Sequence, residues 1–235
     1  MLFRKKMKLL NFLEGPFLEA TLDQGAFRHD GFYDVIIEAL AAQFPPGTAA
    51  DSRQVQGIGV ERDYFSVTFL GAFLWLLKYR TLSTNRNSPR KLAFLDLLFD
   101  MEMPRFIKKH LGAYDVDRVE ESYNHMDIRC KEVYTGELPG GEPPPFLVSP
   151  IWAKDASPPP FRAAASVFLE LVDVRVPGGG ESSPREKLVE TVASHFTRMT
   201  EPVEKASARI NFTWGAPQEE KETSPSREDP PKQGL

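Results

Sequence analysis

The side chains that could carry chemistry in this 235-residue sequence lie far apart from one another. The four histidines each belong to a different segment: His29, His110, His125 and His195. A di-iron carboxylate site needs the pattern Glu-x-x-His on two helices, whereas Glu121 and His125 are one residue too far apart and have no second copy. We therefore expect no metal centre in this protein.

The acidic residues and the cysteine suggest little more. Asp96 and Asp100 share one face of a predicted helix, with Glu102 nearby, and paired carboxylates can bind a metal ion or transfer protons. On an otherwise apolar helix such residues are more often its solvated edge, and we favour that interpretation. Cys130 is the sole cysteine, which excludes an internal disulfide, and no base is positioned beside it in the sequence.

No set of nucleophile, base and orienting group can be assembled from these residues. We expect that Asp100, His125 and Cys130 are not catalytic, that the chain is not an enzyme, and that it binds no cofactor. The formal net charge of −4 has the wrong sign for neutralising phosphates, so we expect no direct sequence-specific binding of nucleic acid. A single cysteine fits a reducing compartment or the mitochondrial matrix.

Residues 1–29 form a basic N-terminal segment. Its cations alternate with apolar residues, and no acidic residue precedes Glu14: Arg4, Lys5, Lys6 and Lys8. The segment lacks the long apolar core and the cleavage site of a secretory signal. Two interpretations stay open, a mitochondrial targeting sequence and a basic, mobile terminus.

Residues 30–138 are predicted to form one helical domain, because apolar residues recur there at helical spacing. Four helices are expected: Gly31–Phe44, a helix from near Asp63, a helix from Pro89 to His110, and a helix from about Asp117 to Tyr134. Pro104 should kink or divide the third of them, because proline removes a backbone hydrogen bond and clashes with the preceding turn.

The second of these helices carries the apolar run Tyr64–Leu77, which is shorter than the ~20 residues of a membrane-spanning helix. A helix that is apolar almost all round is either buried among others or faces a lipid or protein partner. Phe65, Phe69 and Trp75 are the candidates for a partner-binding surface, since aromatic residues dominate the energy of such contacts. The competing interpretation places all three in the chain's own core.

The composition changes after residue 138. Residues 139–182 form a proline- and glycine-rich connector, with eight prolines in its first 22 residues and a short ordered segment near Phe161–Val176. A helix is expected over residues 183–201, and residues 202–235 are expected to be an extended tail that is disordered at its end. The predicted fold class is mainly α, a compact multi-helix domain with a proline-rich, extended C-terminal region.

Four local patterns in residues 30–138 resemble one known family. An apolar helix ends in basic residues, the next helix carries Phe-Asp-x-x, a Leu-Gly-x-x-Asp turn follows, and the last helix ends in Tyr-x-Gly: Lys78 and Arg80, Phe99–Glu102, Leu111–Asp115 and Tyr134–Gly136. Together they are similar to the ubiquinol–cytochrome c chaperone family, whose members assemble the bc1 complex. Two features depart from that pattern, since Glu61-Arg62-Asp63 replaces a proline-containing turn and the residues after Gly136 have no counterpart.

The resemblance implies a helical assembly factor in the mitochondrial matrix or on the matrix side of the inner membrane. Its protein partners would be a small helical co-chaperone, a newly made membrane protein of the cytochrome b class and the mitochondrial ribosome, and peripheral contact with the membrane is left open. The expected function is therefore to support the assembly of respiratory complex III. Two alternatives remain, a non-catalytic accessory subunit of a respiratory complex or ribosome, and a helical protein that binds a lipid or quinone.

Overall fold

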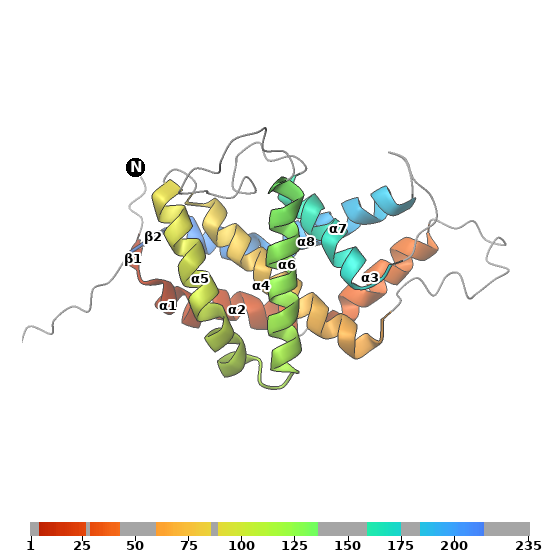
Figure 1. Ribbon diagram of the computed structural model, residues 1–235, viewed down its shortest axis with the longest axis horizontal. Coiled ribbons are helices and arrows are strands. Elements are labelled where there is room, and N and C mark those ends of the chain that lie inside the picture. The colour runs from red at the N-terminus through yellow and green to blue at the C-terminus, as the bar shows by residue number, and fades with distance from the viewer. Residues whose placement is uncertain are drawn as a thin grey trace, which may run out of the picture.

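Helices make up nearly all regular structure in the computed structural model, which describes residues 5–26, 29–42, 60–85, 89–135, 159–174 and 184–213 (Figure 1). The elements in chain order are β1 (Lys5–Met7), α1 (Leu9–Phe12), the short π-helix η1 (Leu13–Phe17), α2 (Leu18–Ala20), a second short π-helix η2 (Thr21–Ala26), α3 (His29–Ala41), α4 (Arg62–Ser83), α5 (Pro89–His110), α6 (Val116–Thr135), α7 (Pro160–Leu171), α8 (Pro184–Ser207) and β2 (Ile210–Phe212). The prediction of a mainly α, compact multi-helix domain is confirmed.

Helix α4 is the centre of the domain. Nearly every residue from Phe65 to Leu82 is buried, because helices α3, α5, α6, α7 and α8 all pack around it. Burying a large apolar side chain stabilises a fold by ~1.5–3 kcal/mol, so this one helix anchors much of the core. Among the helices of the described ranges, none is long and apolar enough to cross a membrane.

A cluster of phenylalanines joins helices α3, α7 and α8 to α4. The ring of Phe32 in α3 lies 4.8 Å from that of Phe69 in α4, 5.8 Å from that of Phe168 in α7 and 5.3 Å from that of Phe196 in α8, centroid to centroid. Aromatic pairs at such separations stabilise a core beyond the area they bury. Helices α7 and α8 are thus integral to the same domain as α3 and α4.

The N-terminal residues are part of this core, so the expectation of a mobile terminus is wrong for residues 5–26. Phe12, Leu13 and Phe17 are fully buried, and the ring of Phe17 meets that of Phe106 of α5 edge-on at 5.3 Å. Strand β1 pairs in parallel with β2, with Lys5 opposite Ile210. The cations dominate the sequence pattern, but the apolar residues that follow them recur at helical spacing and are buried: Leu9, Phe12, Leu13 and Phe17. Mitochondrial targeting by this segment stays a prediction.

The C-terminal boundaries also differ from the expectation. Helix α8 runs through Pro202 to Ser207, and β2 follows it, so residues 202–213 are ordered parts of the domain and not an extended tail. Buried Phe196 and Val203 on one face of α8 hold its last turns against the core. The first half of Phe161–Val176 is helical in α7. The predicted connector at 139–158 and the predicted disordered end at 214–235 lie outside the described residues.

Pro104 was expected to kink or divide helix α5, and the helix runs through it without being divided. Phe106 and Ile107, which follow the proline, are buried, and Glu14 of η1 binds the end of the helix through Lys109 Nζ at 2.9 Å and His110 Nε2 at 3.2 Å. Packing after the proline therefore outweighs the one backbone hydrogen bond that it removes. The pKa of Glu14 is lowered by the hydrogen bonds from Lys109 and His110.

The backbones of α4 and α6 approach closely at Gly71. A Cβ atom added to Gly71 would lie 2.5 Å from Ser122 Oγ and 2.6 Å from the backbone nitrogen of Tyr123. The Ser122 hydroxyl donates to the carbonyl oxygen of Thr68 at 3.1 Å, which ties the two helices at this point. The contact requires glycine because no larger residue leaves room for α6.

We predict that Gly71→Ala lowers the free energy of unfolding by about 1–3 kcal/mol, because the added methyl group pushes α6 away from α4. Gly31→Ala is the matched control, since a Cβ atom at Gly31 in α3 meets nothing within 4 Å. Alanine there should leave stability unchanged or raise it by up to about 1 kcal/mol. Urea unfolding followed by circular dichroism measures both. Equal effects of the two substitutions would contradict the close approach at Gly71.

Candidate functional site

The central, almost completely buried helix α4 carries a fully buried lysine. Lys78 of α4 has no solvent-exposed side-chain surface, and its Nζ atom lies 2.6 Å from Asp96 Oδ1, 2.6 Å from Asp100 Oδ1 and 3.3 Å from Asp127 Oδ1. Asp96 and Asp100 lie one turn apart on α5, and Asp127 lies on α6. One ammonium group therefore joins the three central helices of the chain.

Of the three carboxylates, Asp127 has the most partners. Besides Lys78, it accepts a hydrogen bond from Trp75 Nε1 at 3.0 Å and pairs with Lys131 Nζ at 2.5 Å. Lys131 also lies 3.7 Å from Asp96. We define the lysine cluster as Lys78, Lys131, Asp96, Asp100 and Asp127. Within it, two ammonium groups face three carboxylates.

The pKa directions follow that imbalance. Burial would lower the pKa of Lys78, but Tyr123 and the surrounding carboxylates outweigh that effect and raise the pKa well above 10.5, so the lysine is charged. Burial would raise the pKa of Asp127, yet Lys78 and Lys131 lower it below its ordinary value of 3.8. For Asp100, burial raises the pKa, and Lys78 offsets only part of that effect. Asp100 is thus the carboxylate with the least compensated charge.

The three carboxylates also stand close enough to hold a metal ion, since one oxygen from each lies within 4.8 Å of the others. In this protein the ammonium group of Lys78 already bonds to those oxygens at 2.6–3.3 Å. A lysine side chain therefore occupies the position that a cation would take. The arrangement is chemically a structural ion-pair cluster, in which buried carboxylates are neutralised from within the chain.

The cluster corrects the interpretation of Asp96 as part of a solvated edge, whereas Asp100 is exposed and at the same time paired with Lys78. Asp96 is mostly buried and Asp100 is 43% exposed, and both carboxylates bind Lys78. Lys78 was the feature of the sequence that could have indicated this ion pair, because a cation inside an apolar helix needs a buried counter-charge. The partner on α6 could not be found that way, since Asp127 belongs to a polar helix with many charged residues.

The three predicted partner-binding residues do not form a surface. Phe65, Phe69 and Trp75 are all buried in the chain's own core, and the Trp75 indole is bonded to Asp127. This outcome agrees with the competing interpretation, in which all three are core residues. Cys130 is also buried, and burial raises the pKa of its thiol, which makes it unreactive as a nucleophile. His125 is exposed on α6.

An exposed apolar face lies above the lysine cluster instead. Leu97 and Met101 follow Asp96 and Asp100 by one residue, and Ile128 follows Asp127 in the same way. One residue turns a helix by about 100°, so each aspartate that points to the cluster places its neighbour on the outside. The exposed fractions are 55% for Leu97, 57% for Met101 and 53% for Ile128. We call these three residues the α5–α6 face; the two helices lie side by side at the front of Figure 1.

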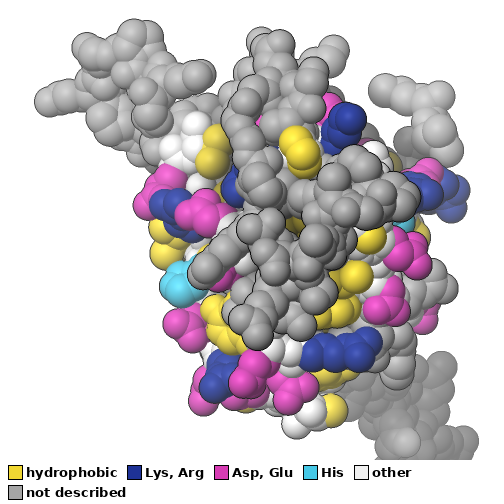
Figure 2. All heavy atoms as spheres, turned by 90° about the vertical axis from the view of Figure 1, so that its right-hand side faces the viewer, with side chains coloured by type: hydrophobic (Ala, Val, Ile, Leu, Met, Phe, Trp, Pro, Cys, Tyr) yellow, Lys and Arg dark blue, Asp and Glu magenta, His cyan; other side chains and the backbone are white. Residues whose placement is uncertain are grey.

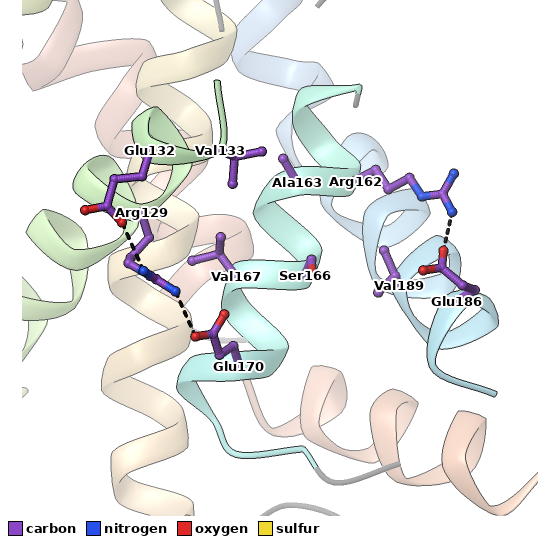
Figure 3. A pocket seen from close by; sticks show the side chains of 10 residues that line it. All are labelled: Arg129, Glu132, Val133, Arg162, Ala163, Ser166, Val167, Glu170, Glu186 and Val189. Atoms are coloured by element: carbon purple, nitrogen blue, oxygen red, sulfur yellow. Dashed lines mark hydrogen bonds and ion pairs between the residues drawn. The ribbon is translucent and has the colours of Figure 1, made fainter. Parts of the chain in front are cut away.

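A different part of the surface is hollowed between α6, α7 and α8. The cleft there has a volume of about 570 Å³. Its lining combines valine, alanine and serine with charged residues: Arg129, Glu132, Val133, Arg162, Ala163, Ser166, Val167, Glu170, Glu186 and Val189 (Figure 3). Arg129 binds Glu132 at 3.0 Å and Glu170 at 2.9 Å, and Arg162 binds Glu186. An anionic ligand would have to displace these ion pairs, because both arginines of the cleft are already paired with glutamates.

The view from the side of α3 and α7 shows hydrophobic side chains interspersed with charged groups of both signs (Figure 2). By contrast, the α5–α6 face places three of the large hydrophobic side chains that are most exposed in the described residues on two adjacent helices. Exposed apolar groups gathered in this way are typical of protein interaction sites. We therefore regard the α5–α6 face, with the lysine cluster beneath it, as the candidate functional site.

Comparison with known proteins adds no relative to this picture. No protein-family model, no curated protein and no solved structure matches the chain. The similarity to the ubiquinol–cytochrome c chaperone family therefore stays a prediction from the residues themselves.

We predict that Asp127→Asn lowers the free energy of unfolding by about 3 kcal/mol, because it removes the charge that Lys78 and Lys131 share in a buried position. Asp100→Asn is the matched control on the same lysine and should change stability by at most about 1 kcal/mol, since Asp100 is partly exposed and its charge is poorly compensated. Chemical unfolding at pH 7 measures both variants. Equal losses in the two variants would contradict the larger contribution that we assign to Asp127.

The lowered pKa of Asp127 also predicts how the stability of the fold depends on pH. The pKa of Asp127 is lower in the folded state than its ordinary value of 3.8. Asp127 therefore stabilises the fold at a pH above 3.8, and that contribution disappears as the pH falls through the folded-state pKa. The difference between the wild-type protein and Asp127→Asn should therefore be constant above about pH 5 and shrink below pH 4. A difference that grows on acidification would contradict the assignment.

Proposed function

We propose that this protein is a non-catalytic assembly factor that binds a newly made, hydrophobic mitochondrial membrane protein of the cytochrome b class and supports the assembly of respiratory complex III. The observation that carries the proposal is the α5–α6 face, where Leu97, Met101 and Ile128 are each more than half exposed. A chaperone needs an exposed apolar surface to contact its client, whereas apolar residues that only stabilise the fold are buried.

The residues that suggested the family support the proposal in a second way. The basic end of the apolar helix and the Phe-Asp pattern of the next helix are distant in sequence, but Lys78 and Asp100 bind each other at 2.6 Å. The Leu-Gly-x-x-Asp turn at Leu111–Asp115 joins α5 to α6. Features taken from three separate places thus belong to one structural unit, the α4–α5–α6 helices around the lysine cluster.

The location and the partners follow from the same proposal. The protein works in the mitochondrial matrix or on the matrix side of the inner membrane, together with a small helical co-chaperone and the mitochondrial ribosome. Its buried core argues for a folded adaptor that offers a limited surface, because the central helix α4 is enclosed by its own chain. The client therefore meets α5 and α6 first.

We predict that a variant carrying Leu97→Ser, Met101→Ser and Ile128→Ser loses function without losing its fold. These side chains are exposed, so the melting temperature should fall by no more than about 3 °C. Pulse labelling of mitochondrial translation products, followed by native gels, should show a several-fold loss of the newly made cytochrome b-class protein and of complex III. Leu10→Ser is the matched control, because Leu10 is 53% exposed but lies on α1.

Normal accumulation of the client in the triple variant would refute the proposal. Purification of the tagged wild-type chain tests the other half of it, since an assembly factor is present in substoichiometric amounts and leaves before the complex is mature. A fixed one-to-one ratio with a mature respiratory complex or ribosome would instead make the protein an accessory subunit.

A further inference from the structure

The charge of the lysine cluster is unbalanced towards the α5–α6 face. Three carboxylates meet two ammonium groups: Lys78 pairs with all three carboxylates, whereas Lys131 pairs only with Asp96 and Asp127. Asp96 and Asp127 are mostly buried, while the side chain of Asp100 is 43% exposed. The excess negative charge of the cluster is therefore most accessible from outside at Asp100.

Apolar side chains surround that charge. Met101 is the next residue to Asp100, and Leu97 lies about one turn before it on the outer side of α5. Ile128 of α6 follows Asp127, which shares the Lys78 ammonium group with Asp100. A carboxylate that is set among exposed leucine, methionine and isoleucine side chains is poorly solvated as soon as anything covers the face.

We infer that the α5–α6 face docks an amphipathic helix of a partner protein, whose apolar residues cover Leu97, Met101 and Ile128 and whose lysine or arginine side chain pairs with Asp100. This inference rests on the proposed function and specifies the chemistry of the partner. The added cation would bring the lysine cluster to three positive and three negative charges, which is the balance that a covered, water-excluded cluster requires.

The shape of the face favours a helix. Leu97 and Met101 are four residues apart on α5, and the five-residue connection Leu111–Asp115 makes α5 and α6 neighbouring helices of one hairpin. Side chains that are one turn apart on adjacent helices form the ridges and grooves into which the ridge of a third helix fits. Apolar residues of the partner at positions i, i+3 or i+4, and i+7 match that spacing.

The charge of the face disfavours two other occupants. A second copy of this chain, related by a twofold axis, would place the same uncompensated Asp100 against itself. An anionic lipid surface would repel Asp100, and two of the cations further along α5 are already engaged, Arg105 with Glu102 at 3.3 Å and Lys108 with Glu120 at 3.9 Å.

The test uses the full chain with one reactive thiol. Leu97→Cys introduces an exposed cysteine, whereas the native Cys130 is buried and does not compete for a thiol reagent. The purified protein, labelled at position 97 with a benzophenone maleimide, is irradiated with detergent-solubilised mitochondria, and cross-linked peptides are sequenced by mass spectrometry. Leu10→Cys, labelled in the same way, is the control for a surface leucine outside the face.

The expected product is one peptide, obtained from position 97 and not from position 10, with apolar residues at helical spacing and a lysine or arginine among them. Adding Asp100→Asn to Leu97→Cys should lower its yield about tenfold, and adding Asp100→Glu should preserve it. Asp100→Lys in this chain, combined with replacement of the partner's cation by glutamate, should restore the product.

The inference is overturned if Asp100→Asn leaves the yield unchanged while the variant melts like the parent protein. It is equally overturned if position 97 cross-links only to a second copy of this chain, to lipid, to a peptide without the helical pattern, or to nothing. Client accumulation in cells separates this failure from that of the proposed function. If the Leu97, Met101 and Ile128 serine variant still impairs accumulation, the assembly role stands and only the charged helical partner is wrong.

Discussion

A lysine ammonium group buried on the central helix α4 is the constraint on which the arrangement of α4, α5 and α6 depends. An isolated ammonium group in such a place would cost several kcal/mol, so the fold has to bring carboxylates to it. Asp96 and Asp100 come from α5 and Asp127 comes from α6, all within 3.3 Å of Lys78 Nζ. The rotation of both helices about their own axes is thereby determined at one point, where apolar packing alone would tolerate other settings.

This internal constraint has an external consequence. Because an α-helix turns about 100° per residue, each aspartate that faces Lys78 sends the next residue outward. Leu97, Met101 and Ile128 are those next residues, so the interaction that anchors the hairpin also positions its apolar surface. A partner that binds there would sense the cluster through Asp100, its accessible carboxylate. If the proposed partner binds there, stability and recognition are coupled through the same few side chains.

The elements with strong periodicity were predictable. The starts of α4, α5 and α6 lie within one or two residues of the positions indicated by Asp63, Pro89 and Asp117, because caps, proline and apolar spacing agree there. Longer-range packing was not predictable. Phe65 and Phe69 would be exposed on an isolated α4, and they are buried by Phe32, which lies before it, and by Phe168, which lies far beyond it.

The two ends of the chain show the same limit. A run of cations obscured the apolar face that contains Phe12 and Phe17, and the pairing of β1 with β2 joins residues 5–7 to residues 210–212. No local pattern contains such a contact. Only part of the candidate site could be predicted from the sequence. Lys78, Asp96 and Asp100 could be singled out there, whereas the contribution of Asp127 from α6 is evident only from the structure.

The central claim is that Lys78 holds the α5–α6 hairpin on α4, and native-state amide hydrogen exchange of Lys78→Met tests it most directly. The claim predicts that amides of α5 and α6 lose about 100-fold in protection, while those of α8 change by less than about tenfold. Lys131→Met, which removes the more exposed ammonium group of the cluster, should have a smaller effect on the same amides. Equal loss of protection in α5 and α8, or unchanged protection in α5, would contradict the account.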